Sequence, residues 1–221
     1  MGIPRIYRKS RENTVLNYDF ADIAEGTGIV LFYGYVDADA TGNNYKFSTR
    51  LFDSRLIESN DSGTWTTTAF VKDLDIDFDL GEQTVSRVIQ GKATIETAWD
   101  FEKTAGGNDI QGYIKYILKR VRGGAETIIG TGQSETFSVM VTGTHDKRIV
   151  LINIDVTKTS LKKGDMLRLT QEGWGRINVV GNSTGKFTIV HDPLNRDGTV
   201  ITPTTDDRTT QLKVYMPFRI E

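Results

Sequence analysis

The chain has 221 residues and a near-neutral charge, with 27 Lys and Arg against 29 Asp and Glu, and it contains no Cys. The charge balance excludes a general nucleic-acid-binding protein, and the absence of Cys excludes disulfides, thiolate metal sites and a Cys nucleophile. Thr, Ile and Val number 28, 20 and 16, against 9 Ala. This balance favours strands over helices, because β-branched side chains fit a pleated surface and Ala is the best helix former.

Basic and apolar residues are interleaved in the first 25 residues, which sets this segment apart from the rest of the chain. One interpretation is a solvated terminus, the commonest fate of such a segment. The other is an arm that lies on a neighbouring subunit, because a disordered tail does not need apolar residues. The residues expected to make this contact are Arg5, Tyr7, Arg8, Lys9 and Arg11.

Neither a signal peptide nor a membrane span is recognisable. The N-terminal segment lacks the apolar region of a signal peptide, and no stretch reaches the roughly 18 apolar residues of a spanning helix. We therefore expect a protein that is made in a cytoplasm and has no membrane partner.

From residue 29 onward, apolar runs and period-two alternation predict a succession of strands separated by turns rich in Gly, Asn and Asp. Residues 112–122 would also fit a helix, although Gly112 and the β-branched residues weigh against one. The spacing is typical of a sandwich or barrel rather than of βαβ units. The predicted strands are 29–36, 45–52, 65–71, 73–80, 84–89, 93–101, 112–122, 127–129, 135–142, 148–156, 166–174, 186–191 and 211–218.

We expect an all-β, antiparallel β-sandwich of jelly-roll type over residues 26–221, preceded by the extended arm at residues 1–25. A long polar loop at 192–208 is expected to add contacts, because surface loops carry much of a protein's binding.

Alternating aspartates form the most distinctive local pattern. Asp73, Asp75, Asp77 and Asp79 share one face of a predicted strand, about 7 Å apart. Three interpretations stay open: a solvated acidic strip, a strip that contacts Lys or Arg of a neighbouring strand or subunit, and a Ca²⁺ site. The intervening residues are apolar and no Gly follows at the sixth position, so the pattern departs from an EF-hand loop. We expect no metal here.

No catalytic motif accompanies the two histidines, His145 and His191. The chain has no phosphate-binding loop, and residues 132–135 do not substitute for the nucleophile elbow of a serine hydrolase. A pair of carboxylates for glycoside hydrolysis would be a spatial arrangement that local sequence does not reveal. We therefore expect no catalytic residue, no cofactor and no enzymatic activity, with a glycoside-acting enzyme as the less favoured alternative.

Two of the three tryptophans could form a platform for a glycan. Trp65 and Trp174 could stack on sugar rings if they are exposed, and Trp174 is flanked by glycines. The alternative is core packing, because each Trp lies in or beside a predicted strand.

Two short stretches carry a resemblance to viral proteins. Residues 161–169, spelled Leu-Lys-Lys-Gly-Asp-Met-Leu-Arg-Leu, resemble a turn-and-strand signature of viral and lectin-like jelly rolls. Residues 18–28, with Phe32, Tyr33 and Gly34, resemble structural proteins of tailed bacteriophages. This resemblance implies a non-enzymatic virion structural protein, such as a capsid decoration, vertex or tail component.

Such a protein would be located in the virion and would act through contacts with copies of itself and other virion proteins, as a homo-oligomer. The alternative is a glycan-binding module of a phage tail or particle surface, with a surface glycan as its partner.

Overall fold

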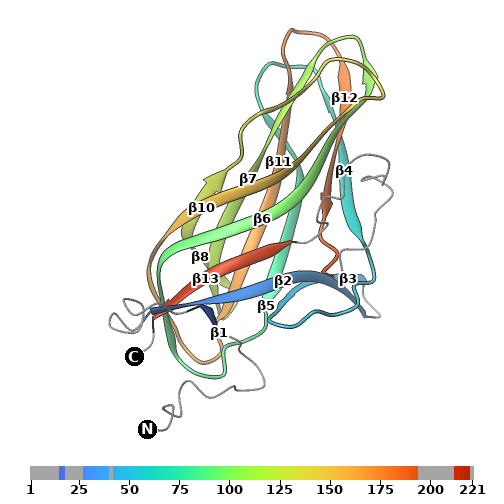
Figure 1. The fold of residues 1–221 in the computed structure, drawn as a ribbon. Helices are drawn as coiled ribbons and strands as arrows, with labels where there is room; N and C mark the ends of the chain where they lie inside the picture. Colours follow the sequence, from blue (N-terminus) through green and yellow to red (C-terminus); the bar gives the residue numbers. More distant parts are fainter. Residues whose placement is uncertain (1–14, 18–26, 40–41, 194–211, 220–221) are drawn as a thin grey trace, which may run out of the picture.

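The computed structural model describes residues 15–17, 27–39, 42–193 and 212–219, and throughout these residues the chain forms strands, turns and loops without a helix (Figure 1). The predicted all-β fold is therefore confirmed. No helix in this part of the chain is long and apolar enough to cross a membrane. The predicted arm contacts Arg5, Tyr7, Arg8, Lys9 and Arg11 lie outside the described residues, as does most of the 192–208 loop.

Thirteen strands are present in the described part of the chain. Residues 112–122, for which a helix was the alternative, belong to a strand. The strands are β1 Val15–Asn17, β2 Thr27–Asp39, β3 Gly42–Ser48, β4 Glu58–Trp65, β5 Val71–Leu80, β6 Arg87–Gly106, β7 Ile110–Arg122, β8 Ala125–Gln133, β9 Phe137–Val139, β10 His145–Leu161, β11 Met166–Ile177, β12 Ser183–Val190 and β13 Lys213–Arg219.

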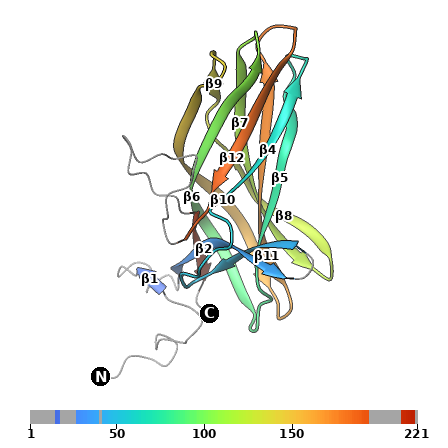
Figure 2. The same ribbon diagram turned by 90° about the vertical axis from the view of Figure 1, so that its right-hand side faces the viewer.

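Strand pairing follows the order β4-β12-β6-β13-β2-β3-β5-β11-β7-β8, with β10 beside β6, β9 beside β7 and β1 beside β2. β3 and β5 are parallel, and they pair through only two residue pairs, Lys46 with Asp79 and Phe47 with Leu80. The other neighbours are antiparallel. Figures 1 and 2 show β6 and β10 on one side of the molecule and β5, β11, β7 and β8 on the other. This arrangement fits a sandwich, whereas the jelly-roll connectivity stays a prediction.

Large rings fill the space between the two sides of the sandwich where glycines remove the opposing side chains. Trp65, Phe101 and Phe187 are at most 1% exposed. A Cβ on Gly185 would lie 2.5 Å from the Trp65 ring, and one on Gly175 would lie closer still. Because inward and outward positions alternate along a strand, these inward glycines leave the residues beside them facing outward.

Candidate ligand-binding sites

An aromatic pair lies on the outward face of β7 and β11. Tyr113 and Trp174 are register partners, and each follows a glycine that faces the core: a Cβ on Gly112 or Gly173 would meet the ring of Phe187. Both aromatic side chains are partly exposed. Their ring planes are 2° from parallel, and their centroids are 6.2 Å apart. We call this pair the aromatic platform.

Polar side chains border the aromatic platform. Trp174 Nε1 donates a hydrogen bond to Glu172 Oε2 at 2.9 Å, and Lys115 Nζ lies 5.9 Å from the centroid of the Trp174 ring. Glu172 also holds Lys72 Nζ at 3.3 Å. These contacts fix the indole ring, with Lys115 over its face and Glu172 at its rim.

A second aromatic contact extends the same face. Phe70 meets Tyr113 edge to face, with centroids 4.8 Å apart, and the Arg176 guanidinium lies 4.3 Å from the Phe70 centroid. Arg176 also donates to Gln111 Oε1 at 2.7 and 3.0 Å. The face therefore alternates aromatic rings with planar polar groups.

The predicted glycan platform needs correction at Trp65. This residue is 1% exposed, and its indole nitrogen donates to the carboxylate of Asp73. The inward glycines at 175 and 185 create the space into which its ring packs, so no ring face is available to a sugar. Trp174, the other predicted residue, does lie on the outward face.

Asp73 differs from the other members of the predicted acidic strip. It sits at a β-bulge, where the register between β5 and β11 shifts at Gly173 and Trp174. Burial raises the pKa of Asp73, and the hydrogen bond from Trp65 partly offsets that rise. Its carboxylate therefore anchors the core ring.

The remaining aspartates of the strip are paired within the sheet. Asp75 accepts a hydrogen bond from Lys72 Nζ at 2.6 Å. Arg168, on the adjacent strand β11, contacts Asp77 at 2.9 Å and Asp79 at 2.6 Å. The contact with Lys and Arg of the strip's own chain and neighbouring strand is thus present, and a contact with another protein stays a prediction.

A buried Ser–His pair lies beside the core. Ser59 Oγ is 2.9 Å from His191 Nε2 and 2.9 Å from Tyr45 Oη. A nucleophile within hydrogen-bond reach of a base is the first requirement of covalent catalysis. However, His191 is fully buried, its Nδ1 has no hydrogen-bond partner to orient the ring, and burial lowers its pKa to about 4. The arrangement is typical of a polar contact within a core.

The other histidine, His145, begins β10 and places Nδ1 2.8 Å from Asp100 Oδ2. Burial raises the pKa of Asp100, and His145 opposes that rise. Within the described ranges, no three His, Cys, Asp or Glu side chains gather in a way that could hold a metal ion.

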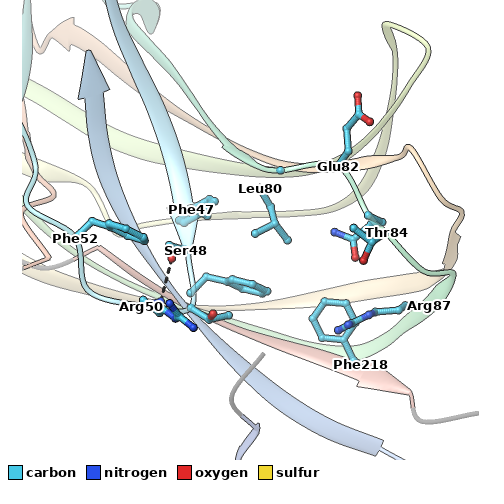
Figure 3. A pocket seen from close by; sticks show the side chains of 13 residues that line it. Phe47, Ser48, Arg50, Phe52, Leu80, Glu82, Thr84, Arg87 and Phe218 are labelled. Atoms are coloured by element: carbon cyan, nitrogen blue, oxygen red, sulfur yellow. Dashed lines mark hydrogen bonds between the residues drawn. The ribbon is translucent and has the colours of Figure 1, made fainter. Parts of the chain in front are cut away.

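A cavity of about 460 Å³ opens where β3 and β5 separate (Figure 3). Its apolar walls are the side chains of Phe32, Phe47, Phe52, Leu80 and Phe218. Two arginines, a glutamate and several hydroxyl and amide groups complete the lining. These polar residues are Ser48, Thr49, Arg50, Glu82, Gln83, Thr84 and Arg87. We call this cavity the end pocket.

Sequence reasoning missed Tyr113 and both arginines of the end pocket. Tyr113 had a usable signal, because Gly112-Tyr113 repeats the glycine–aromatic neighbourhood of Gly173-Trp174. Arg50 and Arg87 had none, since they line the same pocket only through the folding of segments 37 residues apart in the chain.

No family model and no curated protein matches the chain. Among solved structures, an α-amino acid ester hydrolase is similar at 10% identity with a TM-score of 0.50, covering 85% of this chain and 36% of that one. An aminopeptidase from a marine sediment archaeon of the Thaumarchaeota has a TM-score of 0.48 at 8% identity, covering 87% and 37%. The VP2 subviral particle of infectious bursal disease virus has a TM-score of 0.33 at 10% identity, covering 83% and 41%.

This chain spans little more than a third of the two enzymes, and at these identities the likeness shows the fold alone. This likeness nevertheless contradicts two expectations from the sequence: that the protein is non-enzymatic and that it is a virion structural component. The solved structure that matches with a TM-score of 0.50 is a hydrolase. A viral capsid chain is present among the fold neighbours, but its TM-score carries no argument. Residues 161–169 do form the turn and strand that the sequence predicted, with Asp165 accepting the Lys162 backbone N–H at 2.8 Å just before β11.

Proposed function

We propose that this chain serves a hydrolytic enzyme as its carbohydrate-binding β-sandwich. The observation that carries the proposal is the aromatic platform: Tyr113 and Trp174 form a stacked pair of parallel rings on an outward sheet face. The C–H faces of a sugar ring are apolar and pack on aromatic rings, whereas its hydroxyl groups need polar partners at the rim.

The border of the platform supplies hydrogen-bond donors. Lys115 and the amide nitrogen of Gln111 are donors. Glu172 is 8% exposed and already accepts from Trp174 and Lys72. Gln111 Oε1 already accepts from Arg176. Arg176 holds Gln111 in place through two hydrogen bonds. A sugar on the rings would therefore meet preorganised groups, which lowers the entropy cost of binding.

The link to hydrolysis comes from the fold likeness to the ester hydrolase. The match covers 36% of that enzyme's chain. A module of that size can hold a substrate near a reacting centre, and such positioning contributes to catalysis. The proposal assigns binding, and not the chemical step, to Tyr113 and Trp174.

Tryptophan fluorescence tests the proposal directly. Trp65 and Trp99 are each 1% exposed, so a change on adding a soluble polysaccharide should come from Trp174. We expect at least one polysaccharide of a panel of β-glucan, xylan, mannan and chitosan to shift the tryptophan emission of the wild type. The same polysaccharide should retard the protein in affinity electrophoresis.

The variants Trp174→Ala and Tyr113→Ala should each weaken binding at least about tenfold, as expected for central aromatic anchors. Tyr215→Ala is the matched control, because Tyr215 is a partly exposed tyrosine on β13, a strand that does not pair with β7 or β11. Failure of every polysaccharide to bind, or equal binding by folded Trp174→Ala protein, would overturn the proposal.

A further inference from the structure

We propose that the end pocket binds a small carboxylate that carries an apolar body, such as an arylalkanoate. This inference rests on the cavity between β3, β5, β6 and β13 and is independent of carbohydrate binding on the aromatic platform. Its volume, about 460 Å³, lies within the range of small-molecule sites in proteins.

The pocket exists because two strands pair only briefly. β3 and β5 are joined through the residue pairs at Phe47 and Leu80, and β3 ends one residue later, at Ser48. The segments that follow the two strands then leave in different directions. Core side chains that would otherwise be covered therefore line an opening. Figure 3 shows the rings of Phe47 and Phe218 and the side chain of Leu80 around this opening.

One wall of the pocket is anchored by hydrogen bonds. The Gln83 backbone donates to the Asp165 carbonyl at 2.8 Å and accepts from the Gly164 N–H at 2.9 Å. Asp165 is held in turn by Arg122, at 2.6 and 2.7 Å. A wall fixed in this way is preformed, and a preformed cavity is the usual property of a ligand site.

The pocket lining carries two arginines and one glutamate. Arg50 comes from the segment after β3, and Arg87 begins β6, with its guanidinium 5.6 Å from the Phe218 centroid. Figure 3 shows the Glu82 carboxylate pointing away from the Phe47 and Phe218 rings. Burial lowers the pKa of Arg87, but a guanidinium stays protonated in proteins, so the charge remains.

These features select the chemistry of the ligand. Arginine forms paired hydrogen bonds with a planar carboxylate, and such bonds strengthen where water is partly excluded. The ring-lined walls favour an apolar body attached to that carboxylate, because its burial is stabilising in proportion to its area. A fully hydrated inorganic anion would leave those walls unused.

Calorimetric titration of the full chain with 3-phenylpropionate tests the inference. We expect binding in the millimolar range or tighter, as is usual for a ligand of about this size. Arg50→Gln and Arg87→Gln should each weaken it about tenfold, because a charge-assisted hydrogen bond is lost. Arg55→Gln is the matched control: it removes the same charge from an exposed residue outside the pocket and should leave the affinity unchanged.

The neutral analogue 3-phenylpropionamide separates the two parts of the proposal. It should bind at least about tenfold more weakly than the carboxylate. Absence of binding at a 3-phenylpropionate concentration of about 10 mM would overturn the inference. Equal affinity of the amide, or undiminished binding by an Arg87→Gln variant with a wild-type circular dichroism spectrum, would overturn it as well. Carboxylate binding with no polysaccharide binding would support the pocket and refute only the carbohydrate proposal.

Discussion

Replacing Gly175 by Ala should destabilise the fold, and the cost should disappear once Trp65 is made smaller. An added Cβ at position 175 would lie within 3.0 Å of three atoms of the indole ring of Trp65. The ring has little room to move, because it contacts Phe101 and Phe187 at centroid distances of 5.9 and 6.2 Å.

The expected magnitudes follow from packing. Overfilling a close-packed core costs about 1–3 kcal/mol. Gly175 is not among the glycines with positive φ, so alanine recovers about 0.4–1 kcal/mol from the unfolded chain. A net loss of about 2 kcal/mol is expected for Gly175→Ala, and about 3 kcal/mol for Trp65→Leu from the lost burial and cavity. In the Trp65→Leu background the new methyl group enters vacated space, so its further cost should be near zero.

A double-mutant cycle measures this coupling. Urea unfolding, followed by far-ultraviolet circular dichroism, gives the free energy of unfolding of the wild type, both single variants and the double variant. Gly107→Ala is a control, because a Cβ there would meet nothing within 4 Å. The coupling energy should be about 2 kcal/mol. Single-variant losses that add to within about 0.5 kcal/mol would refute the steric account of how Trp65 is held.

Three further predictions concern charge. His191 takes a proton near pH 6.5 when unfolded but near pH 4 when folded, so its stabilisation is present above pH 6.5 and is lost as the pH falls through 4. Between pH 7.5 and 4, the free energy of unfolding in urea should fall by about 3 kcal/mol more for the wild type than for His191→Gln. Parallel dependence of the two proteins on pH would contradict this. The Arg122 guanidinium holds the pKa of Asp165 at about 2, below its ordinary 3.8, so that stabilisation is present above pH 4 and is lost as the pH falls through 2. Arg122→Gln should therefore be less stable than the wild type at pH 6, and the difference in free energy of unfolding should shrink towards pH 2. A difference that does not change with pH would argue against the ion pair. Arg168→Leu leaves acidic neighbours without their shared cation and should lower the free energy of unfolding by about 1–3 kcal/mol. Salt at 1 M, with a screening length of roughly 3 Å, should partly restore this loss. A loss that does not depend on salt would indicate a packing effect instead.

Local pattern predicted the strands better than it predicted their extent. The alternation of apolar and acidic residues along β5 was visible because one face is buried and the other is polar. In contrast, Gly91 and Lys92 suggested a break between two strands, whereas β6 runs from Arg87 to Gly106 without interruption. Gly91 adopts a φ of 118°, and the pairing of β10 with both sides of this bend carries the strand through it.

The candidate sites were predictable only in part, because they depend on which strands become neighbours. Trp174 could be singled out from its flanking glycines, but its partner Tyr113 is 61 positions earlier in the chain and becomes adjacent through the β7–β11 register. Trp65 carried the same local signal as an exposed aromatic residue. Its burial follows from Gly175 and Gly185, which belong to two other strands and whose approach no local pattern encodes.

The two seams of the sandwich explain why the end pocket lies where it does. At the seam between β8 and β10, Gly130 and Gly132 face the side chains of Ile152 and Ile154 so closely that a Cβ would clash, and small residues thus close that side by direct packing. At the other seam, β3 and β5 make a ladder of only two residue pairs, and large rings stand beyond its end. The apolar side chains that stay partly uncovered there offer a surface whose burial by a ligand would be stabilising. Ligand binding is therefore expected at the seam where the hydrogen-bond ladder is shortest and glycine does not allow the layers to close.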